Sequence, residues 1–113
     1  MKHVRTTGHR ETFRILAQTR ALQAAVMTLP PGESTGEPDN EHPDSEQWLL
    51  VLSGTGRARV GRRSAALKEG SLLVVEKRET HQVKNTGRRP VRIRTTKHSS
   101  KPIDGWAAGR SDQ

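Results

Sequence analysis

The sequence of 113 residues contains no cysteine, no tyrosine, one phenylalanine and two tryptophans. Because cysteine is absent, the chain has no disulfide bonds and no thiol nucleophile, and any metal ion must be held by histidine, amide or carboxylate groups. The aromatic residues are too few to form the stacking platforms that bind single-stranded nucleic acid. These absences narrow the candidate chemistry to sites built from nitrogen and oxygen donors.

Long apolar runs are also missing. No stretch approaches the roughly 18 consecutive apolar residues that cross a bilayer, and residues 1–7 lack the apolar segment of a secretory signal. We therefore expect a cytoplasmic protein with no membrane contact. The hydrophobic fraction of 30% is low, but these residues are concentrated in short runs, which indicates one folded domain with a very polar surface.

The formal net charge of +8 raises nucleic acid as a partner, so the distribution of charge matters. Residues 33–46 carry six acids and no lysine or arginine, whereas residues 54–113 carry fifteen of the twenty lysines and arginines. Basic residues recur at strand spacing, Arg57 with Arg59 and Arg92 with Arg94. Residues two apart share one face of a strand, so such pairs are typical of the solvated side of a sheet. Without interleaved aromatics, this pattern disfavours nucleic acid as a partner.

Only β-type signals run through the chain. Apolar or β-branched runs bounded by glycine, proline or asparagine turns predict strands at residues 12–16, 22–29, 48–52, 57–60, 65–67, 72–75, 80–83 and 91–95. Residues 21–27 have helical propensity, but the following Pro30-Pro31 and the β-rich context favour a strand. About eight short strands without a helical period predict an all-β sandwich or barrel.

The apolar alternation stops near the C-terminal end of the chain. We predict a barrel domain over residues 1–98 and a flexible or loosely docked tail over residues 99–113, in which Trp106 is the only anchor. Phosphate-binding loops and nucleophile elbows are absent, so the sequence assigns no catalytic residues and does not decide whether the chain is an enzyme.

Polar residues with metal-binding groups stand next to two of the predicted strands. Asn40, His42 and Gln47 precede the apolar run 48–52, and His81 lies in the strand at 80–83. A single histidine on a strand is more often a hydrogen-bonded core or surface residue than a ligand. Imidazole nevertheless suits zinc, nickel, copper and iron, and oxygen ligands extend the choice to manganese.

The spacing of these residues resembles the two motifs of the cupin superfamily, over about residues 27–96. Six residues stand at the offsets of motif positions: His42, Gln47 and Gly54 in the first motif, and Gly70, His81 and Asn85 in the second. Five positions depart from the family pattern: Ser34 for the opening glycine, Asn40 for the first histidine, Gln47 for the glutamate, and Glu76 and Arg78 for a proline and a glycine. We interpret Asn85 as a turn residue that hydrogen-bonds Thr86-Gly87 rather than as a metal ligand.

The resemblance implies a cupin-like double-stranded β-helix, also called a jelly-roll barrel. It implies a divalent metal ion (zinc, nickel, iron or manganese) held by His42, Gln47 and His81, with Asn40 either a fourth ligand or a turn residue. The implied function is a metal-binding cupin that acts on or binds a small oxygen-rich metabolite, a carboxylate or a sugar derivative. The alternative is a non-catalytic ligand-sensing or storage cupin, with or without metal.

The run at residues 48–52 is apolar on both faces. If Gln47 points inward, as the resemblance implies, then Trp48 points outward on the opposite face. An apolar outer face needs a cover, so we predict a homodimer in which Trp48 is a contact. The remaining histidines, His3, His9 and His98, stand in polar segments and are expected to be exposed to solvent.

Overall fold

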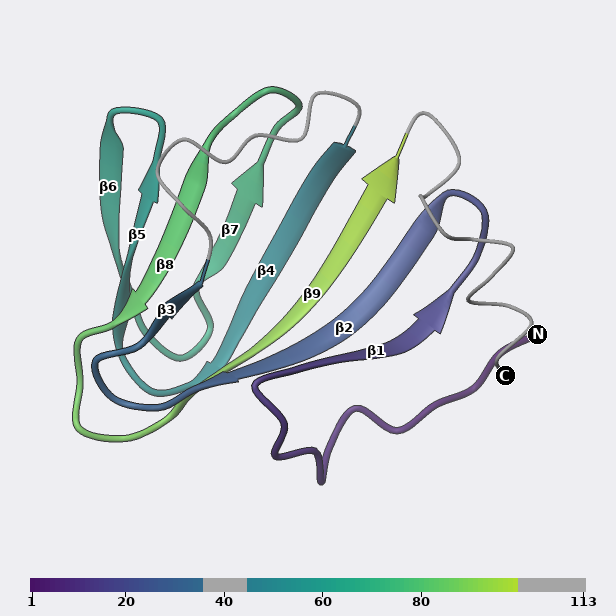
Figure 1. Cartoon of the computed structure of the whole chain (residues 1–113), viewed down its shortest axis with the longest axis horizontal. Coiled ribbons are helices and arrows are strands. Elements are labelled where there is room, and N and C mark those ends of the chain that lie inside the picture. Colours follow the sequence, from purple (N-terminus) through teal and green to yellow (C-terminus); the bar gives the residue numbers. More distant parts are fainter. Residues whose placement is uncertain (36–44, 100–113) are drawn as a thin grey trace.

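A computed structural model describes residues 1–35 and 45–99 of the chain (Figure 1). These residues form nine strands: β1 (Phe13–Gln18), β2 (Leu22–Leu29), β3 (Ser34–Thr35), β4 (Ser45–Ser53), β5 (Gly56–Val60), β6 (Arg63–Leu67), β7 (Leu72–Val75), β8 (His81–Asn85) and β9 (Val91–Ser99). The described part contains no helix, and so none that is long and apolar enough to cross a membrane. The predicted all-β class is confirmed.

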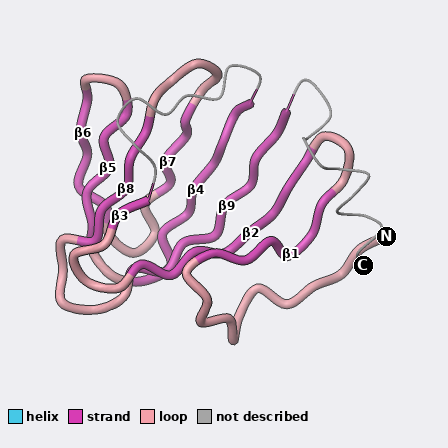
Figure 2. The backbone as a smooth tube through the Cα atoms, in the orientation of Figure 1, coloured by secondary structure: helices cyan, strands magenta, loops and turns pink. Residues whose placement is uncertain are grey.

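The strands form two antiparallel sheets (Figure 2). The larger sheet has the order β1-β2-β9-β4-β7, and the smaller has the order β3-β8-β5-β6. Neighbours that are distant in sequence, such as β2 and β9, require crossovers between the sheets, which is the connectivity of a jelly roll. Buried residues of both sheets, including Leu49 and Val83, belong to one core cluster. The sheets therefore pack face to face around a common interior.

Strand alternation decides which side chains enter that interior. On β4, Leu49 and Val51 are 2% and 1% exposed, while Trp48 and Leu50 are 47% and 37% exposed. Since Gln47 shares the face of Leu49, the prediction that Gln47 faces inward and Trp48 outward is confirmed. On β8, the alternate residues His81, Val83 and Asn85 are buried in the same way.

Asn85 has the structural role expected from turn chemistry. Its Nδ2 donates to the carbonyl oxygens of Leu29 and Arg89, each at 2.8 Å, and its Oδ1 accepts from the N–H of Gly87 at 2.8 Å. These bonds join the end of β2 to the connection between β8 and β9. The amide is fully used in this way, so Asn85 is not available to a metal ion.

Two strands extend well beyond the apolar runs that predicted them. β4 begins at Ser45 and β9 continues to Ser99, because these two strands pair from Ser45 opposite Ser99 to Val51 opposite Ile93, with a register shift before Ser53 opposite Arg92. The two-residue strand β3, which pairs with β8, has no apolar signal and was not predicted. Backbone pairing with a distant strand extends an element beyond what its own side chains indicate.

Candidate functional site

Two of the predicted metal ligands meet in a small cavity inside the barrel. Its volume is about 10 Å³, which is room for one water molecule or ion. The walls come from β4, β7, β8, β9 and the turn before β8: Ser45, Gln47, Val75, Glu76, Glu79, His81 and Lys97. The structure therefore brings together Gln47 and His81, which are far apart in sequence.

Gln47 is held in a defined orientation. It lies opposite Val75 of β7 and Lys97 of β9. Its Nε2 donates to Oγ1 of Thr95 at 2.9 Å, and Thr95 is buried. Because the NH₂ group is engaged by a neighbouring strand, the carbonyl oxygen is the part of the amide that remains for a ligand. A metal ion binds glutamine through that oxygen.

His81 opens β8 opposite Val60 and is 7% exposed. A buried imidazole and an amide carbonyl are both donors that divalent transition-metal ions accept, so these two residues fit such an ion. Within residues 1–35 and 45–99, no three histidines, cysteines, aspartates or glutamates are grouped to hold a metal. His42 and Asn40, the other predicted ligands, lie outside the described residues.

Lys97 is a site residue that the sequence did not reveal. It lies on β9 opposite Gln47, is partly buried and lines the same cavity. The segment after Thr96 had lost its apolar alternation, so it was not predicted to be strand. Because β9 in fact continues to Ser99, strand alternation places Lys97 on the inner face, after Val91, Ile93 and Thr95.

The arginine pairs do not reach the interior. On β5 the residue between Arg57 and Arg59 is the buried Ala58, and on β9 Ile93 is buried between Arg92 and Arg94. All four arginines therefore lie on the outer faces of the sheets. The positive charge at the cavity comes from Lys97 instead.

The turn between β7 and β8 contains the two departures from the second cupin motif. The N–H of Glu76 donates to Oε1 of Glu79 at 2.8 Å, a bond that a proline at this position would remove. Arg78 has a φ of 70°, in the left-handed region that favours glycine. The backbone thus adopts the conformation for which the family uses glycine, although the side chain is an arginine.

Arg78→Gly is expected to stabilise the fold by about 1 kcal/mol, because a residue with a Cβ is strained in the left-handed region. The free energy of unfolding in urea measures the effect. Lys77→Gly is the matched control, since Lys77 is exposed in the same turn and lacks a positive φ. If both glycine variants lose stability equally, Arg78 is not strained.

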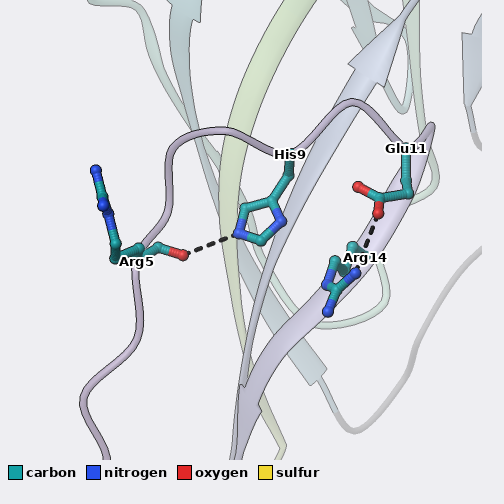
Figure 3. Close-up of polar contacts among 4 residues, drawn as sticks. All are labelled: Arg5, His9, Glu11 and Arg14. Atoms are coloured by element: carbon teal, nitrogen blue, oxygen red, sulfur yellow. Dashed lines mark hydrogen bonds and ion pairs between the residues drawn. The ribbon is translucent and has the colours of Figure 1, made fainter.

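A separate polar group lies at the N-terminal segment and β1 (Figure 3). Nε2 of His9 donates to the carbonyl oxygen of Arg5 at 3.0 Å, and Arg14 donates to Oε1 of Glu11 at 3.0 Å. A backbone hydrogen bond and the bond from Arg14 lower the pKa of Glu11. His9 is partly buried, contrary to the expectation, whereas His3 and His98 are exposed as predicted. This group lies at β1 and the segment before it. β1 and β7 are the two opposite edges of the larger sheet, so the group does not belong to the cavity.

Comparison with protein families places most of the barrel in one family. A family model described as "Cupin domain" matches residues 25–96, which include Gln47 and His81. The tetracenomycin polyketide synthase protein TcmJ of Streptomyces glaucescens is 32% identical over 67 residues. That match covers 59% of this chain and 44% of TcmJ, so the chain corresponds to less than half of that relative.

Solved structures have the same architecture. BH2720 from Bacillus halodurans is 25% identical with a TM-score of 0.76, over 85% of this chain and 76% of that one. KdgF from Halomonas sp. is 18% identical with a TM-score of 0.75, over 92% and 97% of the two chains. A predicted oxalate decarboxylase from Thermotoga maritima is 19% identical with a TM-score of 0.68, over 87% and 99%. At these lower identities the last two similarities concern the fold alone.

Proposed function

The chain belongs to the cupin family, and from that premise we propose that it is a metal-binding domain for a small oxygen-rich metabolite. The observation that carries the proposal is the one-ion cavity in which the buried imidazole of His81 and the oriented amide of Gln47 meet. His42 is the proposed third ligand and Asn40 the candidate fourth. A bound zinc, nickel, iron or manganese ion would act there as a Lewis acid towards a carbonyl or carboxylate.

The charges around the cavity support a carboxylate as the ligand. Imidazole and amide ligands are neutral, so the bound ion keeps its double positive charge. The charged residues that line the same cavity are Lys97, Glu76 and Glu79. An anionic oxygen is favoured beside the ion and Lys97, and disfavoured beside the two carboxylates. By its name, the similar predicted oxalate decarboxylase acts on a small carboxylate, which agrees with this class.

The alternative function is a non-catalytic ligand-sensing or storage module. The specific observation in its favour is Gln47, which replaces the carboxylate ligand of the family and would bind metal more weakly. A screen for turnover of small carboxylates by protein of known metal content separates the two. Turnover that follows metal content supports an enzyme, and binding without turnover supports the module.

Small carboxylates are expected to raise the melting temperature of the metal-loaded protein more than neutral sugars of equal size, in proportion to occupancy. The physical reason is attraction to the divalent ion and to Lys97. Differential scanning fluorimetry with and without a chelator measures the effect. The metal-free protein should lose most of the difference. Equal stabilisation by neutral polyols would contradict the carboxylate proposal.

Gln47→Glu is expected to raise the affinity for zinc by about tenfold or more, because a carboxylate adds charge attraction to the site. The hydroxyl of Thr95 can donate to the new carboxylate, so the contact between β4 and β9 is kept. Zinc titration calorimetry provides the comparison. Gln82→Glu is the control, since Gln82 follows His81 but faces outward opposite Arg59. A lower affinity in the Gln47 variant alone would place the metal elsewhere.

We also propose that two copies of the chain form a dimer through the outer face of β4 and β7. Trp48, Leu50, Leu72 and Val74 are exposed on this face by 47%, 37%, 54% and 39%. Trp48 lies opposite Val74, and Leu50 lies opposite Leu72, so the four side chains form one continuous patch. The described part of the chain leaves this patch open to solvent, and a second copy would cover it.

A further inference from the structure

A second cavity opens between the edge strands β6 and β7. Its volume is about 280 Å³, far larger than that of the metal-site cavity. The two strands belong to different sheets, and each has a single hydrogen-bonded neighbour, β5 or β4. Space between them is therefore not closed by backbone pairing. We call this cavity the β6–β7 cleft.

One side of the cleft is apolar. Ala58, Val60, Ala65 and Leu73 line it, and Val60 and Leu73 also pack against the buried core cluster. Ala58 is 1% exposed and belongs to that cluster. The cleft floor is thus a fixed surface suited to the C–H groups of a small ligand.

The charged part of the lining is Arg63, Glu76 and Glu79, and Ser64 and Val74 complete it. Arg63 lies opposite Val60 on the inner face of β6. Within residues 1–35 and 45–99 the ion pair is the one between Arg14 and Glu11, so the guanidinium of Arg63 has no carboxylate at ion-pair distance there. The cleft thus offers a donor at Arg63 and acceptors at Glu76 and Glu79, which suits the hydroxyl groups of a polyol.

The cleft adjoins the metal-site cavity. Glu76 and Glu79 line both spaces. The carboxylate of Glu79 is held in place by the N–H of Glu76 at 2.8 Å, and its remaining lone pairs can accept from hydroxyl groups. A ligand with one end beside His81 can therefore extend past Glu79 towards Arg63.

We propose that the β6–β7 cleft is the subsite for the hydroxylated tail of a sugar acid. The carboxylate end points from the cleft towards the metal, hydroxyls donate to Glu79, and Arg63 donates to oxygens at the far end. This inference rests on the proposed function, because the proposed metal ion binds the carboxylate end. It adds that the chain selects a long sugar acid over a short hydroxy acid.

Calorimetric titration of the zinc-loaded protein with three probes tests this. Gluconate carries one carboxylate and a long polyol tail, glycerate lacks most of the tail, and glucarate ends the tail in a second carboxylate. We expect gluconate to bind more tightly than glycerate, and glucarate to bind at least as tightly as gluconate, because its second carboxylate reaches the guanidinium of Arg63. Amide chemical shifts in β6 and β7 should change with gluconate and not with glycerate.

Arg63→Ala should reduce the preference for gluconate over glycerate by about tenfold, the usual effect of losing a hydrogen bond from a charged donor. Arg62→Ala is the matched control, since Arg62 has the same charge in the same hairpin and does not line the cleft. Glu79→Gln keeps an acceptor for the N–H of Glu76 and removes the charge. It should weaken gluconate binding more than glycerate binding, because an amide oxygen accepts a hydroxyl hydrogen bond less strongly than a carboxylate does.

Each outcome decides one proposal. If wild type binds glycerate and gluconate equally, or if the two arginine variants behave alike, the cleft is not a tail subsite, and the metal-site proposal is unaffected. If zinc-loaded wild type binds none of the three acids, the proposed function fails and the subsite fails with it.

Discussion

Replacing His81 with alanine is expected to lower the affinity for divalent metal by at least about a hundredfold. Mutation of a residue that only hydrogen-bonds a metal ligand already lowers metal affinity by about 10–100-fold. His81 is proposed to bind the ion directly, so its loss should cost more. His81 is the single histidine of the described residues that lines the inner cavity, because His3 and His98 are exposed and His9 belongs to the N-terminal group. Zinc titration calorimetry gives the affinity of each variant.

His98→Ala is the matched control for this experiment. His98 lies on β9 opposite Glu46 and is exposed on the outer face of the larger sheet. Its loss should leave zinc binding unchanged, and circular dichroism should show the same β-sheet spectrum for both variants. Equal zinc affinity in the two variants would remove His81 from the site.

Replacing Trp48 with glutamate is expected to convert a dimer into a monomer, or to make the protein insoluble. A charge at the centre of the apolar patch would be buried without a partner, and burial of an unpaired charge is among the most costly changes at an interface. The dissociation constant should rise at least about a hundredfold, measured by analytical ultracentrifugation at micromolar concentration. Phe13→Glu is the control, because Phe13 is 51% exposed on β1 at the far edge of the same sheet.

The ends of the patch carry opposite charges. Glu46 accepts a hydrogen bond from Nε1 of Trp48 at 3.0 Å, and Arg94 lies opposite Leu50, further along β4. Nε of Arg94 is buried and has no hydrogen-bond partner among the described residues. A two-fold axis reverses the second copy, so Glu46 of one subunit can face Arg94 of the other. Wild-type protein that is monomeric at micromolar concentration would contradict the dimer.

The barrel itself could be predicted from the sequence because its signals are local. The motif resemblance placed Gln47 inside, and alternation then placed Leu49 and Val51 inside and Trp48 outside, while Pro30-Pro31 predicted the end of β2 at Leu29. The last residues of β9 could not be predicted in this way. They are strand because they pair with β4 and β2, and such pairing depends on contacts distant in sequence.

The same limit applies to the site. Motif spacing predicted that Gln47 and His81 would lie together, and the structure places both in the lining of one cavity. The bond from Gln47 to Thr95 and the position of Lys97 follow from the register of β4 against β9, which no local pattern contains. Arg78 shows a further limit. It stands where the second cupin motif has a glycine, yet its backbone has the positive φ that favours glycine. His42 and Asn40 remain predictions.

Elemental analysis of wild-type protein, purified without chelator, tests most directly whether Gln47 and His81 hold a metal ion. We expect one divalent ion per chain, and loss of that ion in His81→Ala protein purified in parallel. Wild-type protein that contains no metal, and that binds none when zinc, nickel, iron(II) and manganese(II) are each supplied, would contradict it.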